Sequence, residues 1–150
     1  MEITLRPLRD GDFEYVISRL DEWWGGRSMT GSLPRLFFDH FPATSRLAVD
    51  SATGNTVGFI IGFLSQGDPT TAYIHFVGVD PAARGHEVGR TLYEWFFETA
   101  RAAGRSTVKC LTSTVNTGSV AFHRAMGFTV TEAKDYDGPG QHRMLFTRSV

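Results

Sequence analysis

A strand-like run that leads into a glycine-bearing turn is the part of this sequence best suited to chemistry. The run covers residues 73–79, and after Asp80 and Pro81 it is followed by a turn with Arg84 at its start and Arg90 at its end. A buried strand that leads through such a turn into a helix leaves backbone N–H groups and the positive end of the helix dipole available to a phosphate. The two guanidinium groups can bind phosphate oxygens in a forked geometry. The segment therefore indicates a nucleotide-like ligand.

A second segment, Asn116 to Phe128, follows a later predicted strand. In this order and separation, the two segments resemble the acetyl-CoA-binding motif of the GNAT superfamily of N-acetyltransferases and the motif that follows it in that family. The resemblance runs from about Ile3 to about Thr147. Glycine-rich turns after strands are common, so either segment alone is a weak signal, and the pair together is a strong one.

The resemblance implies that acetyl-CoA is the co-substrate and assigns it a set of binding residues. The strand backbone would contact the pantetheine arm, and the turn and helix start would hold the pyrophosphate. Asn116 would orient the ligand or the following helix through its amide, with a simple cap as the alternative. The full set is Val77, Gly78, Val79, Arg84, Gly85, His86, Glu87, Val88, Gly89, Arg90, Asn116, Ser119 and His123.

Glu87 departs from the family, which usually has a small residue, most often glycine, at this position. A carboxylate in contact with a pyrophosphate is repelled by about 1 kcal/mol in water. We therefore expect the Glu87 side chain to turn to solvent, to Arg84 or to Arg90.

The acid and the base of the reaction are less clearly marked. His123 stands where the family usually has the tyrosine that protonates the departing CoA thiolate, and imidazole is mostly neutral at pH 7. His123 would then donate a hydrogen bond to sulfur or would only pack. No acidic residue lies in the predicted strands 72–79 and 108–112, which leaves Tyr73 and His75 as candidate bases acting through water, or as packed strand residues.

Candidates for acceptor binding lie in two places. Trp23 and Trp24 fall in the region that lines the acceptor site in the family, and adjacent tryptophans at a helix end cannot both face one core. We expect at least one of them to be exposed or to cover a cavity. Asp137, in the loop before the last strand, would attract a cationic amine or form only a solvated turn. A small amine, an antibiotic, an amino acid, a peptide N-terminus and a lysine side chain all remain open as acceptors.

The elements that must position these residues alternate between strands and helices. Asp10 or Asp12 is expected to cap the first helix, and Ser32 the second, with Pro34 in its first turn. In the long third helix, Leu92, Trp95, Phe96 and Thr99 are expected to face the sheet. Strands are predicted over 3–7, 47–49, 57–64, 72–79, 108–112, 128–131 and 144–147, and helices from about 10 to 24 and over 32–41, 88–103 and 119–126.

These elements predict an α/β chain with an α+β mixed sheet. In the resembled family the fold has about seven mostly antiparallel strands and about four helices, splayed between strands 4 and 5. The 150 residues fit one domain over residues 1–150. A splay would leave backbone groups that an extended amide-bearing ligand can satisfy.

Composition limits the classes of partner, compartment and bound metal that fit this chain. The net charge of −1 and scattered cations argue against nucleic acid, and neither a signal peptide nor a membrane span is expected. The single cysteine, Cys110, is expected to be an inert core thiol in a cytoplasmic protein. No metal site is predicted, and a homodimer is left open.

The sequence thus predicts an N-acetyltransferase that moves acetyl from acetyl-CoA to a primary amine by direct attack in a ternary complex. The first alternative is a non-catalytic acyl-CoA-binding or sensing module. A nucleotide-binding regulatory domain is a poorer third, because no Walker lysine or dinucleotide fingerprint is present.

Overall fold

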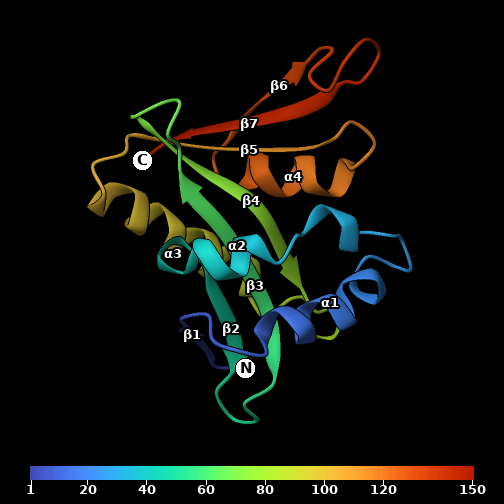
Figure 1. The fold of residues 1–150 in the computed structure, drawn as a ribbon, viewed down its shortest axis with the longest axis vertical. Coiled ribbons are helices and arrows are strands. Elements are labelled where there is room, and N and C mark those ends of the chain that lie inside the picture. The colour runs from blue at the N-terminus through green and yellow to red at the C-terminus, as the bar shows by residue number, and fades with distance from the viewer. The chain divides into compact units, whose positions relative to one another are not determined.

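The computed structural model describes residues 1–150 and contains a mixed sheet of seven strands in the order β1-β2-β3-β4-β5-β7-β6 (Figure 1). The β4–β5 pair is parallel, whereas the β1–β2, β2–β3, β5–β7 and β6–β7 pairs are antiparallel. This is the mixed α/β class that the sequence predicts. The strands are β1 (Ile3–Arg6), β2 (Arg46–Asp50), β3 (Thr56–Leu64), β4 (Thr71–Val79), β5 (Thr107–Ser113), β6 (Thr129–Ala133) and β7 (Arg143–Ser149), and the helices are α1 (Asp12–Trp23), α2 (Leu36–His40), α3 (Val88–Ala102) and α4 (Thr117–Ala125).

The chain divides into two compact units. The first comprises Met1–Phe63 and Phe76–Phe96, and the second comprises Leu64–His75 and Phe97–Val150. Strand β4 and helix α3 contribute residues to both. Each unit is described by itself below, and the single domain over residues 1–150 stays a prediction.

The core of the first unit lies between α1 and strands β2 and β3. Val16, Leu20 and Trp23 follow one another at helical spacing and are at most 5% exposed. They form one cluster with Leu47 of β2 and Phe59 of β3, together with Ile61, Leu33 and Phe38. The spacing of apolar residues in α1, read from the sequence, therefore marks the face that is buried.

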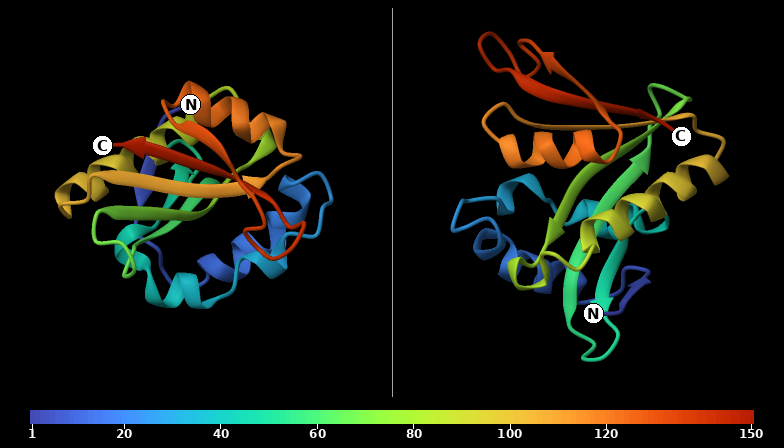
Figure 2. Two further views of the ribbon diagram at one scale, coloured as in Figure 1. Left: turned by 90° about the horizontal axis from the view of Figure 1, so that it is seen from above. Right: turned by 180° about the vertical axis from the view of Figure 1, so that it is seen from behind.

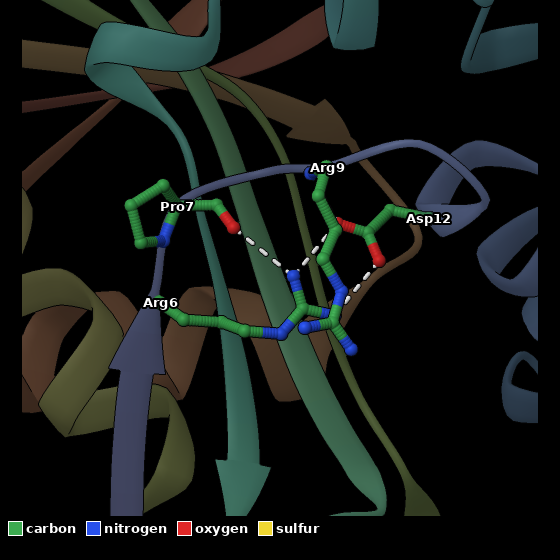
Figure 3. A network of polar contacts seen from close by, with 4 residues as sticks. All are labelled: Arg6, Pro7, Arg9 and Asp12. Atoms are coloured by element: carbon green, nitrogen blue, oxygen red, sulfur yellow. Dashed lines mark hydrogen bonds and ion pairs between the residues drawn. The ribbon is translucent and has the colours of Figure 1, made fainter.

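A buried ion pair ties β1 to the start of α1 (Figure 3). Both terminal nitrogens of the Arg6 guanidinium contact the Asp12 carboxylate, at 2.9 and 2.8 Å. The Arg9 amide donates to the same carboxylate at 2.7 Å, and Asp12 is only 5% exposed. Asp12 is the first residue of α1, so neither Asp10 nor Asp12 is its cap. The cap position belongs to Gly11, with φ of 91° and no side-chain cap bond.

Helix α2 is shorter than expected. Ser32 ends a 3₁₀ turn, Thr30–Ser32, instead of capping the helix, and α2 begins after Arg35 with no side-chain cap. Pro34 precedes Arg35 and so lies before the helix. The sequence therefore predicted a helix in the right segment, but the predicted first residue of that helix was wrong.

The second unit is built on β5, which pairs with β7 along its whole length from Thr107↔Ser149 to Ser113↔Arg143. Helix α3 ends before Gly104, whose φ of 74° lies in the left-handed region that favours glycine, as expected. The Arg105 guanidinium then donates to the carbonyl oxygens of Ser65, Asp68 and Thr71 at 2.9 to 3.1 Å. It thereby fixes the turn before β4 against the segment before β5.

Two expectations about buried residues have different outcomes. On α3, Leu92 and Phe96 are fully buried, but Trp95 and Thr99 are only half-buried, and Tyr93, Phe97 and Ala100 take their places. Trp95 instead lies under the Arg46 guanidinium, 4.5 Å from the ring centre. Cys110 is buried as predicted, and burial raises the pKa of its thiol. None of the helices combines the length and the apolar character needed to span a bilayer.

Candidate active site

In the first unit, the turn between β4 and α3 presents backbone amides in a conformation suited to an anion. Asp80 accepts from the Ala82 amide at 2.9 Å and so caps the short 3₁₀ turn Pro81–Ala83. Gly85 and Glu87 then both adopt left-handed backbone angles, with φ of 84° and 63°. Alternating left-handed residues turn successive N–H groups toward one point, and the first amides of a helix have no partner within that helix. Residues 84–87 are exposed here, as a phosphate-binding turn requires.

Glu87 is therefore a non-glycine residue in a backbone region that favours glycine. Its carboxylate lies 3.0 Å from the Arg90 guanidinium, whose other end lies 3.7 Å from Glu94. The side chain thus takes one of the directions expected from the sequence, toward Arg90. Arg84, at the other end of the turn, takes no part in an ion pair within 4 Å. Of the two bracketing arginines, Arg84 is the one without a carboxylate partner.

Gly78 of β4 is required by packing. A Cβ atom at this position would lie 2.4 Å from the Phe59 ring and 3.1 Å from the Trp24 ring. Phe76, two residues earlier, packs against the same two rings, with centroid distances of 5.2 Å to Trp24 and 5.9 Å to Phe59. The absence of a side chain at Gly78 therefore has a structural cause, and any contact with a ligand here would use its backbone.

The two tryptophans of the first unit have different surroundings. Trp23 is 5% exposed and stacks on Phe59, so it is a core residue. Trp24 is half-buried and lies beside Gly78 and Phe76. Trp24 nevertheless packs against the same cluster that contains Trp23. The expectation that the pair cannot share one core, and that at least one of the two is exposed or covers a cavity, is therefore not confirmed.

In the second unit, Asn116 and Ser119 organise the start of α4. The Asn116 side-chain oxygen accepts from the Ser119 amide at 3.1 Å, and its amide nitrogen donates to the Thr112 hydroxyl at 3.3 Å. Asn116 is therefore the N-cap of α4 and anchors it to the end of β5. This is the cap that the sequence left as the alternative, and the contact of Asn116 with a ligand stays a prediction.

His123 is a buried, neutral residue in the second unit. Its ring stacks on Phe146 at 3.9 Å with an interplanar angle of 4°, and the residue is 6% exposed. Nδ1 lies 2.7 Å from the Ser119 carbonyl oxygen, which can only accept, so Nδ1 carries the proton. Burial lowers the pKa of His123, although the Ser119 contact opposes this. The neutral ring therefore has its lone pair on Nε2 and is poorly suited to act as an acid.

Tyr73 lies at the last residue pair between β4 and β5. The register covers Thr71↔Thr107, Ala72↔Val108 and Tyr73↔Lys109 and goes no further. Burial raises the pKa of Tyr73, and Tyr136, Cys110 and Asp137 add to this effect while Arg143 opposes it. The phenol is therefore protonated at neutral pH, which argues against its use as a base.

The loop over residues 134–142 projects beyond the ends of β6 and β7 (Figure 2). Asp137 is paired there with the Arg143 guanidinium at 2.5 Å, and Tyr136 is 57% exposed. The structure places Asp137 within electrostatic reach of Tyr73, together with Tyr136 and Arg143. Tyr73 and Asp137 are candidate site residues from the sequence, whereas Arg143 is not. The sequence signal for Arg143 was its positive charge just before the last predicted strand, and a single charge does not identify a site.

Comparison with known proteins agrees with this arrangement. The model of the acetyltransferase (GNAT) family matches residues 13–128, and the chain belongs to this family. The chain is 30% identical over 57% of its length to an L-2,4-diaminobutyric acid acetyltransferase of Nocardia farcinica. It is 31% identical over 70% of its length to a mycothiol acetyltransferase of Gordonia bronchialis. These matches span 44% and 33% of the two relatives, so the chain matches less than half of each.

Solved structures share the fold. Ard1 from Thermoplasma volcanium aligns over 100% of this chain and 99% of its own, with a TM-score of 0.81 and 24% identity. The acetyltransferase yncA from Salmonella typhimurium, solved with its cofactor acetyl-CoA, aligns over 99% of this chain and 94% of its own, with a TM-score of 0.73 and 18% identity. At these identities the likeness establishes the fold.

Proposed function

We propose that this protein transfers the acetyl group of acetyl-CoA to a primary amine. The observation that carries the proposal is the turn before α3, where Gly85 and Glu87 adopt left-handed angles beside exposed Arg84. Family membership and a solved neighbour with acetyl-CoA support the choice of ligand. The pyrophosphate would bind the amides of 84–90, and the pantetheine arm would follow the backbone of Val77 to Val79.

The proposed reaction is direct attack by the neutral amine nitrogen on the thioester carbonyl carbon. The C–N bond forms, the C–S bond breaks, and the amine loses one proton while the thiolate gains one. An amide of β4 near Val77 would stabilise the oxyanion. An alkylamine has a pKa near 10.4, so a group must accept its proton, and His75 acting through water is the proposed base.

The acceptor stays open within this proposal. The two relatives are named for different compounds, one for L-2,4-diaminobutyric acid and the other for mycothiol, so they do not select one acceptor. We propose that Trp24 forms part of the acceptor wall and that Asp137 acts by fixing Arg143 beside Tyr73.

Calorimetry of acetyl-CoA binding tests the pyrophosphate assignment. Arg84→Ala should weaken binding about tenfold at low salt, because a hydrogen bond to a charged group contributes about 1.5 kcal/mol. Arg90→Ala should cost less, since Arg90 is shared with Glu87 and Glu94. Arg101→Ala, which removes the cation of a Glu98 pair at the other end of α3, is the control. If Arg84→Ala and Arg90→Ala both bind as the wild type does, the assignment is wrong.

A non-catalytic acyl-CoA-binding module would pass the same binding test. The neutral, buried state of His123, where the family usually has an acid, keeps this alternative open. An amine library screened for free CoA separates the two functions. Thiol release that depends on the amine supports the enzyme, whereas tight binding without release supports the module.

A further inference from the structure

Glu87 is held in its left-handed conformation through both its backbone and its side chain. Its carbonyl oxygen accepts from the Thr91 amide at 3.0 Å and from the Thr91 hydroxyl at 2.9 Å. Its carboxylate lies 3.0 Å from the Arg90 guanidinium. A left-handed angle in a residue with a Cβ atom is strained and persists only where the surrounding structure holds it. Thr91 and Arg90 therefore act together to keep the φ of 63° at Glu87.

Arg90 faces carboxylates and brings no net positive charge to the turn. Its Nε contacts Glu87, and its Nη1 lies 3.7 Å from Glu94, one helical turn further along α3. Two carboxylates against one guanidinium leave this cluster with a net negative charge, so the cluster as a whole does not attract a phosphate. The attraction for a phosphate at the turn then falls to the backbone amides and to exposed Arg84.

The conformation of Glu87 matters for binding because it helps to aim the amides of the turn. Gly85 and Glu87 both have left-handed angles, and such residues turn successive N–H groups toward one point. A turn that already has this shape without a ligand binds a phosphate without first having to reorganise. If Glu87 relaxed to an unstrained angle in the free protein, part of the binding free energy would go into restoring the turn.

Resting on the proposed function, we infer that Arg90 is a positioning residue for the pyrophosphate and not one of its ligands. It binds the Glu87 carboxylate and thereby keeps the turn in its phosphate-binding shape before acetyl-CoA arrives. Glycine adopts left-handed angles without strain, so a turn with glycine in place of Glu87 needs no such contact. The role of Arg90 is therefore tied to the presence of Glu87.

The sharpest test is the sign of the change in Glu87→Ala, measured by calorimetry of acetyl-CoA binding. This variant removes a negative charge near the phosphates, so charge repulsion alone predicts tighter binding. Positioning predicts the reverse, because alanine keeps the strain and loses the Arg90 contact. We expect Glu87→Ala to bind acetyl-CoA about fivefold more weakly, which corresponds to the roughly 1 kcal/mol that a left-handed angle costs. Glu87→Gln keeps an oxygen that accepts from Arg90 and should bind as the wild type does.

A double-mutant cycle separates positioning from direct contact with the phosphate. Arg90→Ala should weaken acetyl-CoA binding about fivefold in the wild-type background, as Glu87→Ala does. In the Glu87→Gly background, Arg90→Ala should change the affinity by no more than about twofold. Arg84→Ala should weaken binding about tenfold in both backgrounds, because Arg84 is assigned to the phosphate directly. Arg101→Ala, which removes a cation near the other end of α3, is the control.

Amide hydrogen exchange of the free protein provides a readout without a ligand. The Thr91 amide donates to the Glu87 carbonyl, so its protection factor reports whether the turn keeps its shape. Arg90→Ala and Glu87→Ala should each lower this protection about fivefold. In the Glu87→Gly background, Arg90→Ala should leave the protection unchanged. The amides of residues 95 and 96, further along α3, are the reference and should not respond.

The inference is overturned if Glu87→Ala tightens acetyl-CoA binding. It is also overturned if Arg90→Ala binds as the wild type does, or if it weakens binding equally in the wild-type and Glu87→Gly backgrounds, which would make Arg90 a phosphate ligand. Failure of the proposed function looks different. The wild type would then bind neither CoA nor acetyl-CoA, although the protection of Thr91 would still depend on Arg90.

Discussion

At the scale of single residues, Glu87 combines a strained backbone with an exposed ion pair. Its φ of 63° costs a residue with a Cβ atom about 1 kcal/mol relative to glycine. Glu87→Gly should therefore be about 1 kcal/mol more stable to urea than Glu87→Ala, because both variants lose the Arg90 contact and only alanine keeps the strain. Equal stability of the two variants would show that the left-handed angle costs nothing here.

The same residue shows where sequence reasoning stops. The sequence identifies Glu87 as a departure from the family and predicts that its side chain turns to solvent or to an arginine. It does not show the left-handed backbone angle at this position, because backbone angles cannot be read from residue types alone. Asn116 was predictable because a cap acts within three residues. The stacking of His123 on Phe146 was not, because it depends on how α4 packs on β7.

At the scale of elements, the Arg6–Asp12 pair connects β1 and α1. Asp12→Ala should lower the free energy of unfolding by about 3 kcal/mol, because it leaves Arg6 unpaired in a partly buried site and the Arg9 amide without its acceptor. Glu14→Ala, on the same helix, removes an exposed pair with Arg35 and should cost less than about 1 kcal/mol. Urea unfolding measures both. Similar losses for the two variants would mean that burial does not strengthen the first pair.

The bounds of elements with a long apolar run or stripe were predicted to within a few residues. The bounds of elements with a weak apolar pattern were not. Strand β4 and helix α3 carry long apolar runs or stripes, so their positions follow from the sequence. Helix α2 has five residues, too few for a periodic pattern to fix its start. The face of α3 was only partly right, because Trp95 is placed by a cation on β2 that no local pattern reveals.

At the scale of the whole molecule, the residues assigned to acetyl-CoA fall in both compact units. Val77 to Arg90 belong to the first, and Asn116, Ser119 and His123 belong to the second. The sequence assigns both segments to one ligand only through resemblance to a family, because no local pattern links residues so far apart in the chain. Whether one ligand protects both segments is therefore a direct test of the assignment.

Hydrogen exchange in the presence of acetyl-CoA performs that test. At 100 times the dissociation constant, binding adds about 2.7 kcal/mol to stability, and the contacted amides should be protected beyond this general effect. We expect such added protection at residues 84–90 and again at 116–120. The β1–β2 pair, which contributes no residue to the proposed site, is the reference for the general effect. Protection at 84–90 alone would support the pyrophosphate assignment and would remove Asn116 and Ser119 from the residues assigned to acetyl-CoA. Their contacts with each other and with Thr112 would then serve only to cap α4.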